Sequence, residues 1–209
     1  MASIVDWLFE CEGHNPNTGW CVRPNLLVAG VVAVAVAITA LYLWRQRKYR
    51  RIVGAGAIAQ DDPRREDVRE LLELHLAFAR GQTPPEDAHA LDAGALAADP
   101  AITFFSLREP GTDKLLAVGA LKRLDARHAE IKSMHTAAEA RGRGVGRALV
   151  EHLVEHARQQ GFRRVSLETG TGDAFAAARS LYARAGFERC APFGDYERTE
   201  NNVYMTLAL

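Results

Sequence analysis

The chain has 209 residues with 26 basic and 26 acidic side chains, so its formal net charge is zero. A chain of this length holds one domain with a substantial core and some additional sequence. The balanced charge, without a basic block rich in aromatic residues, argues against nucleic acid as the main partner.

Residues 1–24 contain two of the three cysteines. Cys11 and Cys21 flank a turn-rich segment, GHNPNTG. On a non-cytoplasmic side they would either form a disulfide that closes this loop or remain two free thiols. His14 lies between them, but this spacing fits no standard zinc pattern, and we predict no metal site.

Residues 25–44 contain no charged side chain and are mostly Val, Ala, Leu and Ile. At about 1.5 Å per residue, a helix of this length approaches the roughly 30 Å of a bilayer's hydrocarbon core. A basic juxtamembrane linker, residues 45–52, follows, and basic flanks stay on the cytoplasmic side. We therefore predict a single transmembrane helix with the N-terminus outside and the following domain on the cytoplasmic or organelle-matrix side. A buried helix or an amphipathic partner helix is the alternative, although the run is apolar on every face.

Residues 53–209 read as one soluble domain. Asp62-Pro63 predicts a helix start, because an N-cap is followed by proline at the first helical position. The elements predicted in its first half are a strand within 52–59, a helix over 62–81, a short helix over 91–96, and strands over 102–108 and 115–124.

The central stretch, from Glu130 to Gly161, reads as a strand, a glycine-rich loop and a long helix. From Val145 the apolar residues recur at helical spacing, and Gly161 is a suitable helix end. The elements predicted after it are a strand over 164–169, a helix over 175–185, and strands over 187–193 and 203–209. Strands followed by alternating strands and helices predict an α+β domain with a mixed central sheet flanked by helices.

The glycine-rich loop is suited to holding phosphates. Glycines let the backbone approach a ligand, and the first turn of the following helix has unpaired N–H groups at its positive dipole end. Arginines between the glycines add charge for a polyphosphate. A solvated basic turn before an ordinary helix is the alternative, and the spacing matches neither the Walker A loop nor G-x-G-x-x-G.

The spacing Arg141-x-x-Gly144-x-Gly146 resembles the acetyl-CoA pyrophosphate loop of the GNAT N-acetyltransferase superfamily. The stretch LYARAGF, from Leu181, is similar to the late helix of that superfamily, which ends in L-Y-x-x-x-G-F. SLETG and the closing NNVYMTLAL are similar to its YsnE-type branch, and the resemblance covers about residues 53–209. It implies a GNAT-like fold and acetyl-CoA as the cofactor.

The resemblance also implies roles for individual residues. The pantetheine arm of the cofactor would pair with the backbone of the strand before the loop, namely Met134, His135 and Thr136. Its pyrophosphate would be held by the loop, namely Arg141, Gly142, Arg143, Gly144, Val145, Gly146 and Arg147. Tyr182 matches the general acid that returns a proton to the sulfur of CoA, and it is otherwise a packed tyrosine. Phe175 departs from the family pattern, which often has asparagine there, so one polar anchor for the cofactor is missing.

Acetyl transfer to an amine also needs a group that accepts the proton of the amine. Glu130 and Glu168 lie on the two strands that would flank the acetyl group, and strand alternation puts Glu130 on the face of Lys132 and Met134. Either carboxylate could have a raised pKa there and act as the base, and His135 is a third candidate for the base. The alternative for each of the three is a structural role. Two further histidines could lie on the substrate side and are otherwise structural: His75 and His89.

We therefore expect a membrane-anchored N-acetyltransferase that moves an acetyl group from acetyl-CoA to a primary amine of a small-molecule acceptor. The alternative is an accessory subunit of a larger membrane protein complex, with a transferase domain whose activity is retained or vestigial. A third reading is an acetyltransferase for lysines or N-termini of neighbouring membrane proteins. Neither the residues nor the resemblance identifies the acceptor.

Overall fold

The computed structural model describes residues 34–35, 39 and 58–209. The segment with Cys11 and Cys21, the linker 45–52 and most of the apolar run 25–44 lie outside these residues, so the predictions for them stay predictions. Within the described part of the chain, no helix is long and apolar enough to cross a membrane. Contacts divide the chain into two units, 1–48 and 49–209, and the fold below is that of the second.

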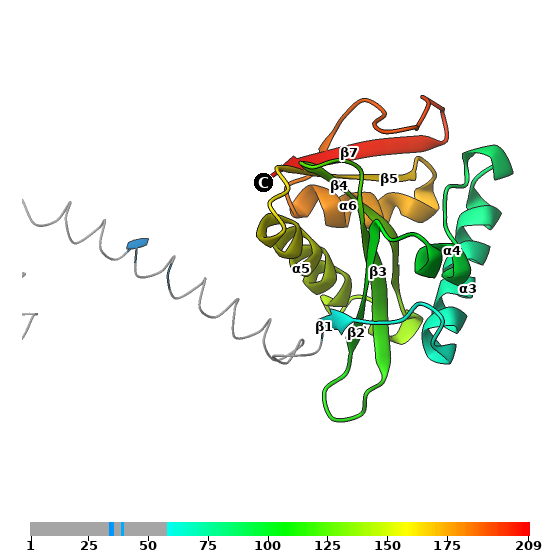
Figure 1. Cartoon of the computed structure of the whole chain (residues 1–209), viewed down its shortest axis with the longest axis vertical. Helices are drawn as coiled ribbons and strands as arrows, with labels where there is room; N and C mark the ends of the chain where they lie inside the picture. The colour runs from blue at the N-terminus through cyan, green and yellow to red at the C-terminus, as the bar shows by residue number, and fades with distance from the viewer. Residues whose placement is uncertain (1–33, 36–38, 40–57) are drawn as a thin grey trace, which may run out of the picture. The chain divides into compact units, whose positions relative to one another are not determined.

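A seven-stranded sheet forms the centre of this unit, in the order β1-β2-β3-β4-β5-β7-β6 (Figure 1). The strands are β1 (Ile58–Gln60), β2 (Ile102–Arg108), β3 (Leu115–Arg123), β4 (His128–Thr136), β5 (Arg164–Gly170), β6 (Glu188–Arg189) and β7 (Asn202–Ala208). β4 and β5 run parallel, and the other neighbouring strands pair antiparallel. The predicted α+β fold with a mixed sheet is confirmed.

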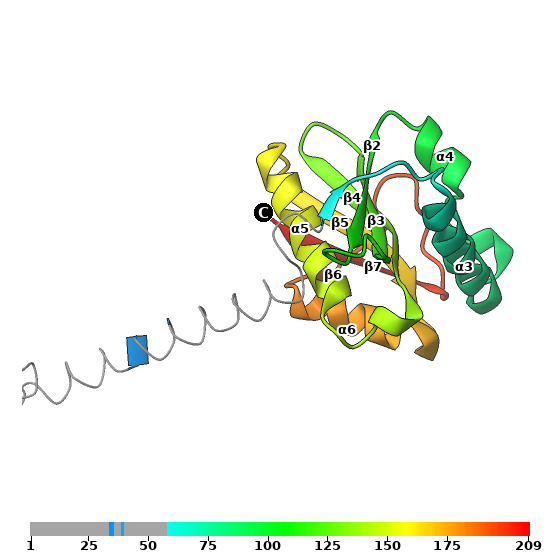
Figure 2. The ribbon, with the colours of Figure 1, turned by 90° about the horizontal axis from the view of Figure 1, so that it is seen from below.

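Helices cover both faces of the sheet (Figure 2). They are α3 (Glu66–Gln82), α4 (Ala93–Ala98), α5 (Val145–Gln159) and α6 (Ala176–Arg184), with 3-10 turns η1 (Pro85–Asp87), η2 (Ala138–Ala140) and η3 (Asp173–Phe175). The apolar spacing of α5 buries Val145, Leu149 and Leu153 completely against the sheet. α3 and α4 lie on the face opposite α5 and α6, so the ends of β4 and β5 are enclosed between helices.

A β-bulge interrupts β4 near its carboxyl end. Between two regular pairs with β3, β4 has one residue more, so Ser133 and Met134 both lie opposite Gly119. Ser133 takes the left-handed conformation, with φ 52°. A Cβ added to Gly119 would come within 2.6 Å of the Met134 Sδ, so glycine leaves room for the bulge. The simple alternation predicted for this strand therefore fails beyond Lys132.

β4 and β5 separate after a short paired stretch. Their parallel ladder ends with Ile131 opposite Leu167. The edge of β4 that faces β5 is therefore unpaired from Lys132 to Thr136, although both strands continue. This separation opens the sheet at the point where the glycine-rich loop begins.

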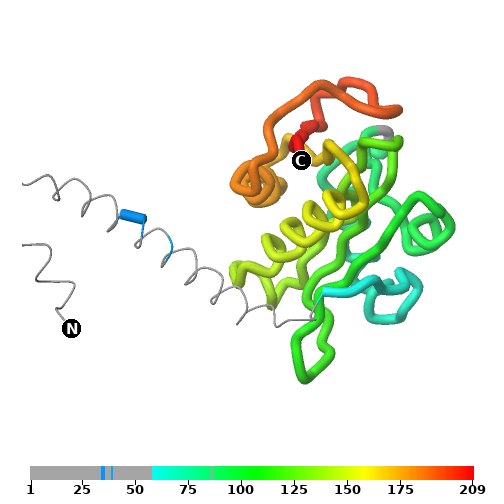
Figure 3. The backbone as a smooth tube through the Cα atoms, turned by 60° about the vertical axis from the view of Figure 1, so that its left-hand side comes forward, coloured from blue at the N-terminus to red at the C-terminus, as the bar shows by residue number. Residues whose placement is uncertain are grey.

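Two predicted boundaries are wrong for local reasons. The first helix begins at Glu66 and not at Asp62, because the Asp62 carboxylate accepts the Arg64 amide (2.9 Å) within a separate turn. The strand predicted over 187–193 is shortened to β6, since Pro192 has no N–H to continue pairing. The chain instead leaves the sheet in a long connection before β7, drawn in orange to red in Figure 3.

An ion-pair cluster fastens the start of the domain to β2. The Arg108 guanidinium, 12% exposed, binds the carboxylates of Asp61 (2.9 Å) and Asp67 (2.6 Å). Burial alone would raise the pKa of Asp61, but hydrogen bonds from Ser106 and Arg108 hold it below its ordinary value. The cluster joins residues next to β1, α3 and β2, so it contributes to the position of α3 beside the site.

Candidate active site

The glycine-rich loop adopts the conformation needed to place backbone amides at the start of α5. Gly142 and Gly144 have φ angles of 71° and 84°, and Gly144 is the N-cap of the helix. The amides of residues 145–147, in the first helical turn, have no acceptor one turn earlier in the helix. Their N–H groups and the helix dipole make this loop a ready anion site. The structure therefore puts the predicted phosphate-binding residues together.

The arginines of the loop surround these amides. Arg141 folds back on β4, where its Nε donates to the Thr136 carbonyl oxygen (3.2 Å). Arg147 forms an exposed pair with Glu151 (2.7 Å), and Arg143 a long one with Glu109 (3.5 Å). Exposed pairs of this kind contribute little energy, so the guanidinium groups are free to turn to a stronger anion.

A groove leads from this loop along the unpaired edge of β4. It is a cavity of about 370 Å³ between the loop, the end of β4 and helix α6. Its wall includes the three residues predicted to pair with the pantetheine arm, Met134, His135 and Thr136. Gly146 packs closely here, because a Cβ added to it would lie 3.2 Å from the Thr136 hydroxyl.

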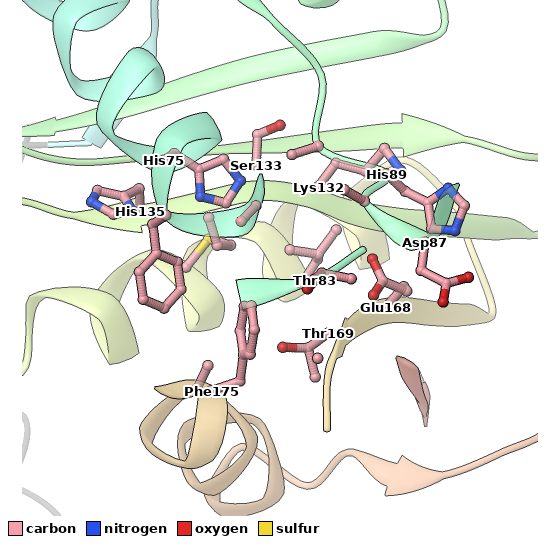
Figure 4. Close-up of a pocket in the computed structure, with 18 of the residues that line it drawn as sticks. His75, Thr83, Asp87, His89, Lys132, Ser133, His135, Glu168, Thr169 and Phe175 are labelled. Carbon is pink, nitrogen blue, oxygen red and sulfur yellow. The ribbon is translucent and has the colours of Figure 1, made fainter. Parts of the chain in front are cut away.

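A second, smaller cavity of about 130 Å³ adjoins the groove (Figure 4). The two cavities have six wall residues in common: Phe78, Met134, His135, Phe175, Ala178 and Tyr182. We call the smaller one the acceptor cavity; it continues between β4, β5 and the turn η1. A group held in the groove and a group held in the acceptor cavity would therefore meet at these shared residues.

Tyr182 lies at this meeting point. It is on α6, its side chain is 7% exposed, and it faces both cavities. Burial, with the nearby Glu168, raises its pKa well above the ordinary value. The phenol is therefore neutral across the physiological range and retains a proton that it can donate.

Glu168 projects from β5 into the acceptor cavity (Figure 4). Burial raises its pKa to about 7, and the nearby Glu130 and Asp87 charges add to the effect although Lys132 opposes it. Its side chain has no hydrogen bond or ion pair with any described residue. A carboxylate with this pKa and no partner has the properties of a general base.

Glu130 also lines the acceptor cavity, but its carboxylate is engaged. It accepts hydrogen bonds from the Tyr196 hydroxyl (2.5 Å) and the Lys132 ammonium (3.0 Å). Lys132 in turn donates to the Tyr196 oxygen (2.6 Å). Accepting a substrate proton would require Glu130 to break this ion pair, so Glu168 is better placed for that task.

The two histidines near the meeting point are electrically neutral. His75 and His135 pack edge to face with ring centroids 5.4 Å apart. Burial lowers the pKa of each to about 4, with a smaller contribution from a neighbouring positive group. At neutral pH neither ring carries charge, and each is too weak a base to compete with Glu168 for a proton.

Phe175, which stands where the family often has asparagine, forms an apolar wall. Its ring covers Gly170, since a Cβ there would lie 2.4 Å from two ring carbons, and it packs against Phe78 with centroids 5.1 Å apart. Arg179 fixes this corner by donating to the carbonyl oxygens of Gly170 (2.7 Å) and Gly172 (2.8 Å). Phe175 therefore gives the cavities an apolar wall at the position where the family often has a polar asparagine.

Sequence reasoning missed Asp87, which lines the acceptor cavity, and Tyr196, which lies beside it and contacts Glu130 and Lys132 of its wall. Asp87, in η1, is held by Asn201, whose Nδ2 donates to its carboxylate (2.8 Å) across 114 positions of sequence. Tyr196 comes from the long connection before β7 and also packs against His89 (4.8 Å). The proline pair at residues 84–85 signals a rigid turn, but no local pattern indicates that it contacts β7.

The comparisons with known proteins agree with this geometry. The profile of the Acetyltransferase (GNAT) family matches residues 65–187. The chain belongs to the GNAT acetyltransferase family. The matched region runs from α3 through the phosphate loop to the end of α6, and so includes nearly all of both cavities.

Individual GNAT relatives cover most of the chain. The uncharacterized N-acetyltransferase YsnE of Bacillus subtilis (strain 168) is 44% identical over 149 residues, which are 71% of this chain and 97% of YsnE. The uncharacterized N-acetyltransferase YedL of Escherichia coli (strain K12) is 39% identical over 73% of this chain and 94% of YedL. The predicted likeness to the YsnE-type branch is confirmed.

A solved structure with a similar fold contains CoA. The Bacillus subtilis acetyltransferase in complex with CoA has a TM-score of 0.54 to this chain at 18% identity, over 73% of this chain and 97% of that one. This GNAT protein is an N-acetyltransferase that uses acetyl-CoA. The groove and its glycine-rich loop are where the residues suit that cosubstrate.

Proposed function

We propose that this GNAT protein acetylates a primary amine of a small molecule bound in the acceptor cavity. The observation that carries the proposal is the junction of the two cavities, which has Tyr182 in its wall and the unpartnered Glu168 beside it. A proton donor and a proton acceptor thus face the same point from different elements, α6 and β5.

The groove suits acetyl-CoA in three respects. Amides at the start of α5 and the arginines around them would hold the diphosphate. The unpaired edge of β4 over residues 132–136 offers backbone groups to an amide-containing arm, as another strand would. Acetyl-CoA, when bound, supplies a thioester whose carbonyl carbon reacts with amines. We propose that a β4 amide near the bulge stabilises the negative charge that develops on the carbonyl oxygen.

The proton transfers follow from the two side chains. Glu168 in its ionised form takes a proton from the acceptor's nitrogen, directly or through a water molecule, so that the lone pair can form the new C–N bond. Tyr182 donates its phenolic proton to the sulfur as the C–S bond breaks, and recovers one afterwards by exchange with solvent. The products are an N-acetylated amine and CoA with a free thiol. Glu130 keeps Lys132 in place in this scheme.

The size of the acceptor cavity favours a small molecule. Pockets for drug-sized ligands commonly enclose about 300–1,000 Å³, several times the 130 Å³ present here. A protein N-terminus with its flanking chain would not fit inside, whereas a short amine would. The domain has a candidate acid, Tyr182, and a candidate base, Glu168. Their presence also favours an enzyme over an accessory subunit.

The test is acetylation by the purified full-length protein. Acetyl-CoA would be supplied with a panel of short amines and, separately, with a peptide carrying a free N-terminus and lysine. We expect mass spectrometry to find acetylated small amines and CoA in equal amounts. Acetylated peptide with no acetylated amine would overturn the small-molecule acceptor, and no product with either would overturn the proposed function.

We further propose that residues 25–44 anchor the protein in a membrane as a single span. The support is the uncharged apolar sequence followed by the basic linker 45–52. Thr39, one of the described residues, fits this environment. Its hydroxyl donates to the carbonyl oxygen of Ala35 (2.8 Å), so the hydroxyl has a hydrogen bond without water. Alkaline carbonate extraction of membranes tests this proposal. The protein should stay in the pellet, and its release into the supernatant would refute the anchor.

A further inference from the structure

The charges in the acceptor cavity indicate the chemical class of the acceptor. Of the described residues in its wall, Lys132 alone has a permanent positive charge. That charge is already neutralised, because the ammonium lies 3.0 Å from Glu130 and donates to Tyr196 (2.6 Å). The cavity therefore has no free cation with which to receive a carboxylate on the acceptor.

Two carboxylates in the same wall form no ion pair with any described residue, although the charge of Lys132 acts on Glu168 from a distance. Among the described residues, Glu168 has no hydrogen-bond partner for its side chain, and the Asp87 carboxylate accepts one hydrogen bond, from the neutral side-chain amide of Asn201. Figure 4 shows both side chains on the same side of the cavity, near His89 and Lys132. Burial lowers the pKa of His89, so its ring is neutral at physiological pH and does not offset these charges.

The acceptor cavity has an inner and an outer end. Its inner end meets the groove at Tyr182. Its outer end opens into a further surface pocket lined by Ala88, His89, Glu130 and Lys132 among others. Asp87 is the neighbour in sequence of Ala88, which lines both the acceptor cavity and this outer pocket. Glu168 is on β5 together with Gly170, which packs against Phe175 in the wall shared with the groove.

Buried polar atoms without partners also indicate an absent ligand. Ser133, 8% exposed and held in the left-handed conformation by the bulge, lines the acceptor cavity with a hydroxyl that has no described partner. The Nδ1 of His75, in the same wall, is also unpartnered. Buried polar groups are rarely left unpaired in native proteins. A turn of either side chain toward the cavity would let the acceptor or a water molecule supply the missing hydrogen bond.

We propose that the acceptor is a short diamine without a carboxylate group. Its reacting amine lies between Glu168 and Tyr182, and its second amine, as an ammonium, binds the Asp87 carboxylate. A charge-assisted hydrogen bond of this kind fixes the length and direction of the acceptor. An amino acid of the same length would bring its carboxylate into a cavity with two unpaired carboxylates, and like charges disfavour that. This inference rests on the proposed function.

Three probes that share one carbon skeleton test the inference with the wild-type full-length protein. Butylamine has one amine, putrescine has a second amine, and ornithine adds a carboxylate to putrescine. We expect kcat/KM for putrescine to exceed that of butylamine by about tenfold or more, and that of ornithine by a larger factor. Equal values for putrescine and ornithine, or no preference for putrescine over butylamine, would overturn the diamine while leaving amine acetylation intact.

Asp87→Asn adds a test of the second ammonium's partner. Asparagine keeps the shape and can still accept the hydrogen bond from Asn201, so only the charge is lost. The ratio of kcat/KM for putrescine to that for butylamine should fall about tenfold, mainly through KM, whereas Glu188→Gln on the exposed strand β6 should keep the wild-type ratio. An unchanged ratio in Asp87→Asn refutes the inference. If none of the three probes is acetylated by protein that binds acetyl-CoA, the diamine is refuted, and the panel of short amines then decides separately whether the proposed function stands.

Discussion

Replacing Glu168 with glutamine should remove activity and stabilise the protein above neutral pH. Glutamine has the shape of the protonated carboxyl group but cannot accept a proton from the amine. Loss of a general base commonly costs about 10²–10⁴-fold in rate. A stabilised and inactive variant would separate the catalytic role of Glu168 from a role in holding the fold.

The magnitude follows from the raised pKa of the carboxyl group. Its ordinary pKa is 4.5 and burial raises it to about 7 in the folded protein. Between these values the folded state binds more protons than the unfolded state, so the free energy of unfolding decreases as pH rises from 4.5 through 7. At about 1.4 kcal/mol for each tenfold change in proton affinity, the full effect is about 3 kcal/mol. Water in the open cavity screens part of the charge, so we expect Glu168→Gln to raise the free energy of unfolding by about 2 kcal/mol above neutral pH.

Thermal unfolding of the wild type and of Glu168→Gln, each at pH 5 and pH 8, measures this difference. The variant should gain about 4–8 °C in Tm over the wild type at pH 8 and much less at pH 5. Glu188→Gln, an exposed substitution of the same kind, should have the wild-type Tm at both pH values. A Glu168→Gln variant that is no more stable than the wild type at pH 8 would contradict the conclusion that the Glu168 carboxylate is buried without a partner.

Three further substitutions test the groove, the wall between the cavities and the ion-pair cluster. Gly144→Ala forces a side chain into a left-handed N-cap, so it should cost about 1 kcal/mol of unfolding free energy and weaken acetyl-CoA binding by calorimetry; unchanged affinity would contradict the role of the loop. Gly170→Ala places a methyl group against the Phe175 ring, so it should lower the free energy of unfolding by about 1–3 kcal/mol and raise the KM for the acceptor. Gly172→Ala, which has open space around it, should change neither quantity. Arg108→Met leaves the 9% exposed Asp61 with the more distant Arg65 (3.6 Å) as its cation, and chemical denaturation should detect a loss of about 3 kcal/mol in the free energy of unfolding; a loss below 1 kcal/mol would show that the cluster adds nothing.

The sequence predicts the fold well wherever a local pattern determines the structure. The apolar spacing from Val145 and the end at Gly161 predict α5, and the strand over 102–108 agrees with β2 at both ends. The arginine and glycine spacing predicts the phosphate loop, because amides and left-handed glycines are properties of neighbouring residues. These features need no knowledge of distant contacts.

Other features depend on contacts between distant residues and could not be predicted in this way. The bulge at Ser133 needs the missing side chain of Gly119 on another strand, so alternation along β4 alone gives the wrong face. One partner of Glu130, Tyr196, comes from the connection before β7, whereas no described residue pairs with the Glu168 carboxylate. The charge balance of the acceptor cavity is a property of the assembled sheet.

In the proposed reaction the amine and the thioester meet beside Tyr182. The most direct test of this arrangement is Tyr182→Phe, measured both for acetyl-CoA affinity by calorimetry and for CoA release with an accepted amine. The phenolic oxygen has no described partner, so its removal should leave the Kd for acetyl-CoA and the Tm close to wild type while lowering kcat about 10²-fold or more. Turnover at the wild-type rate would contradict the account.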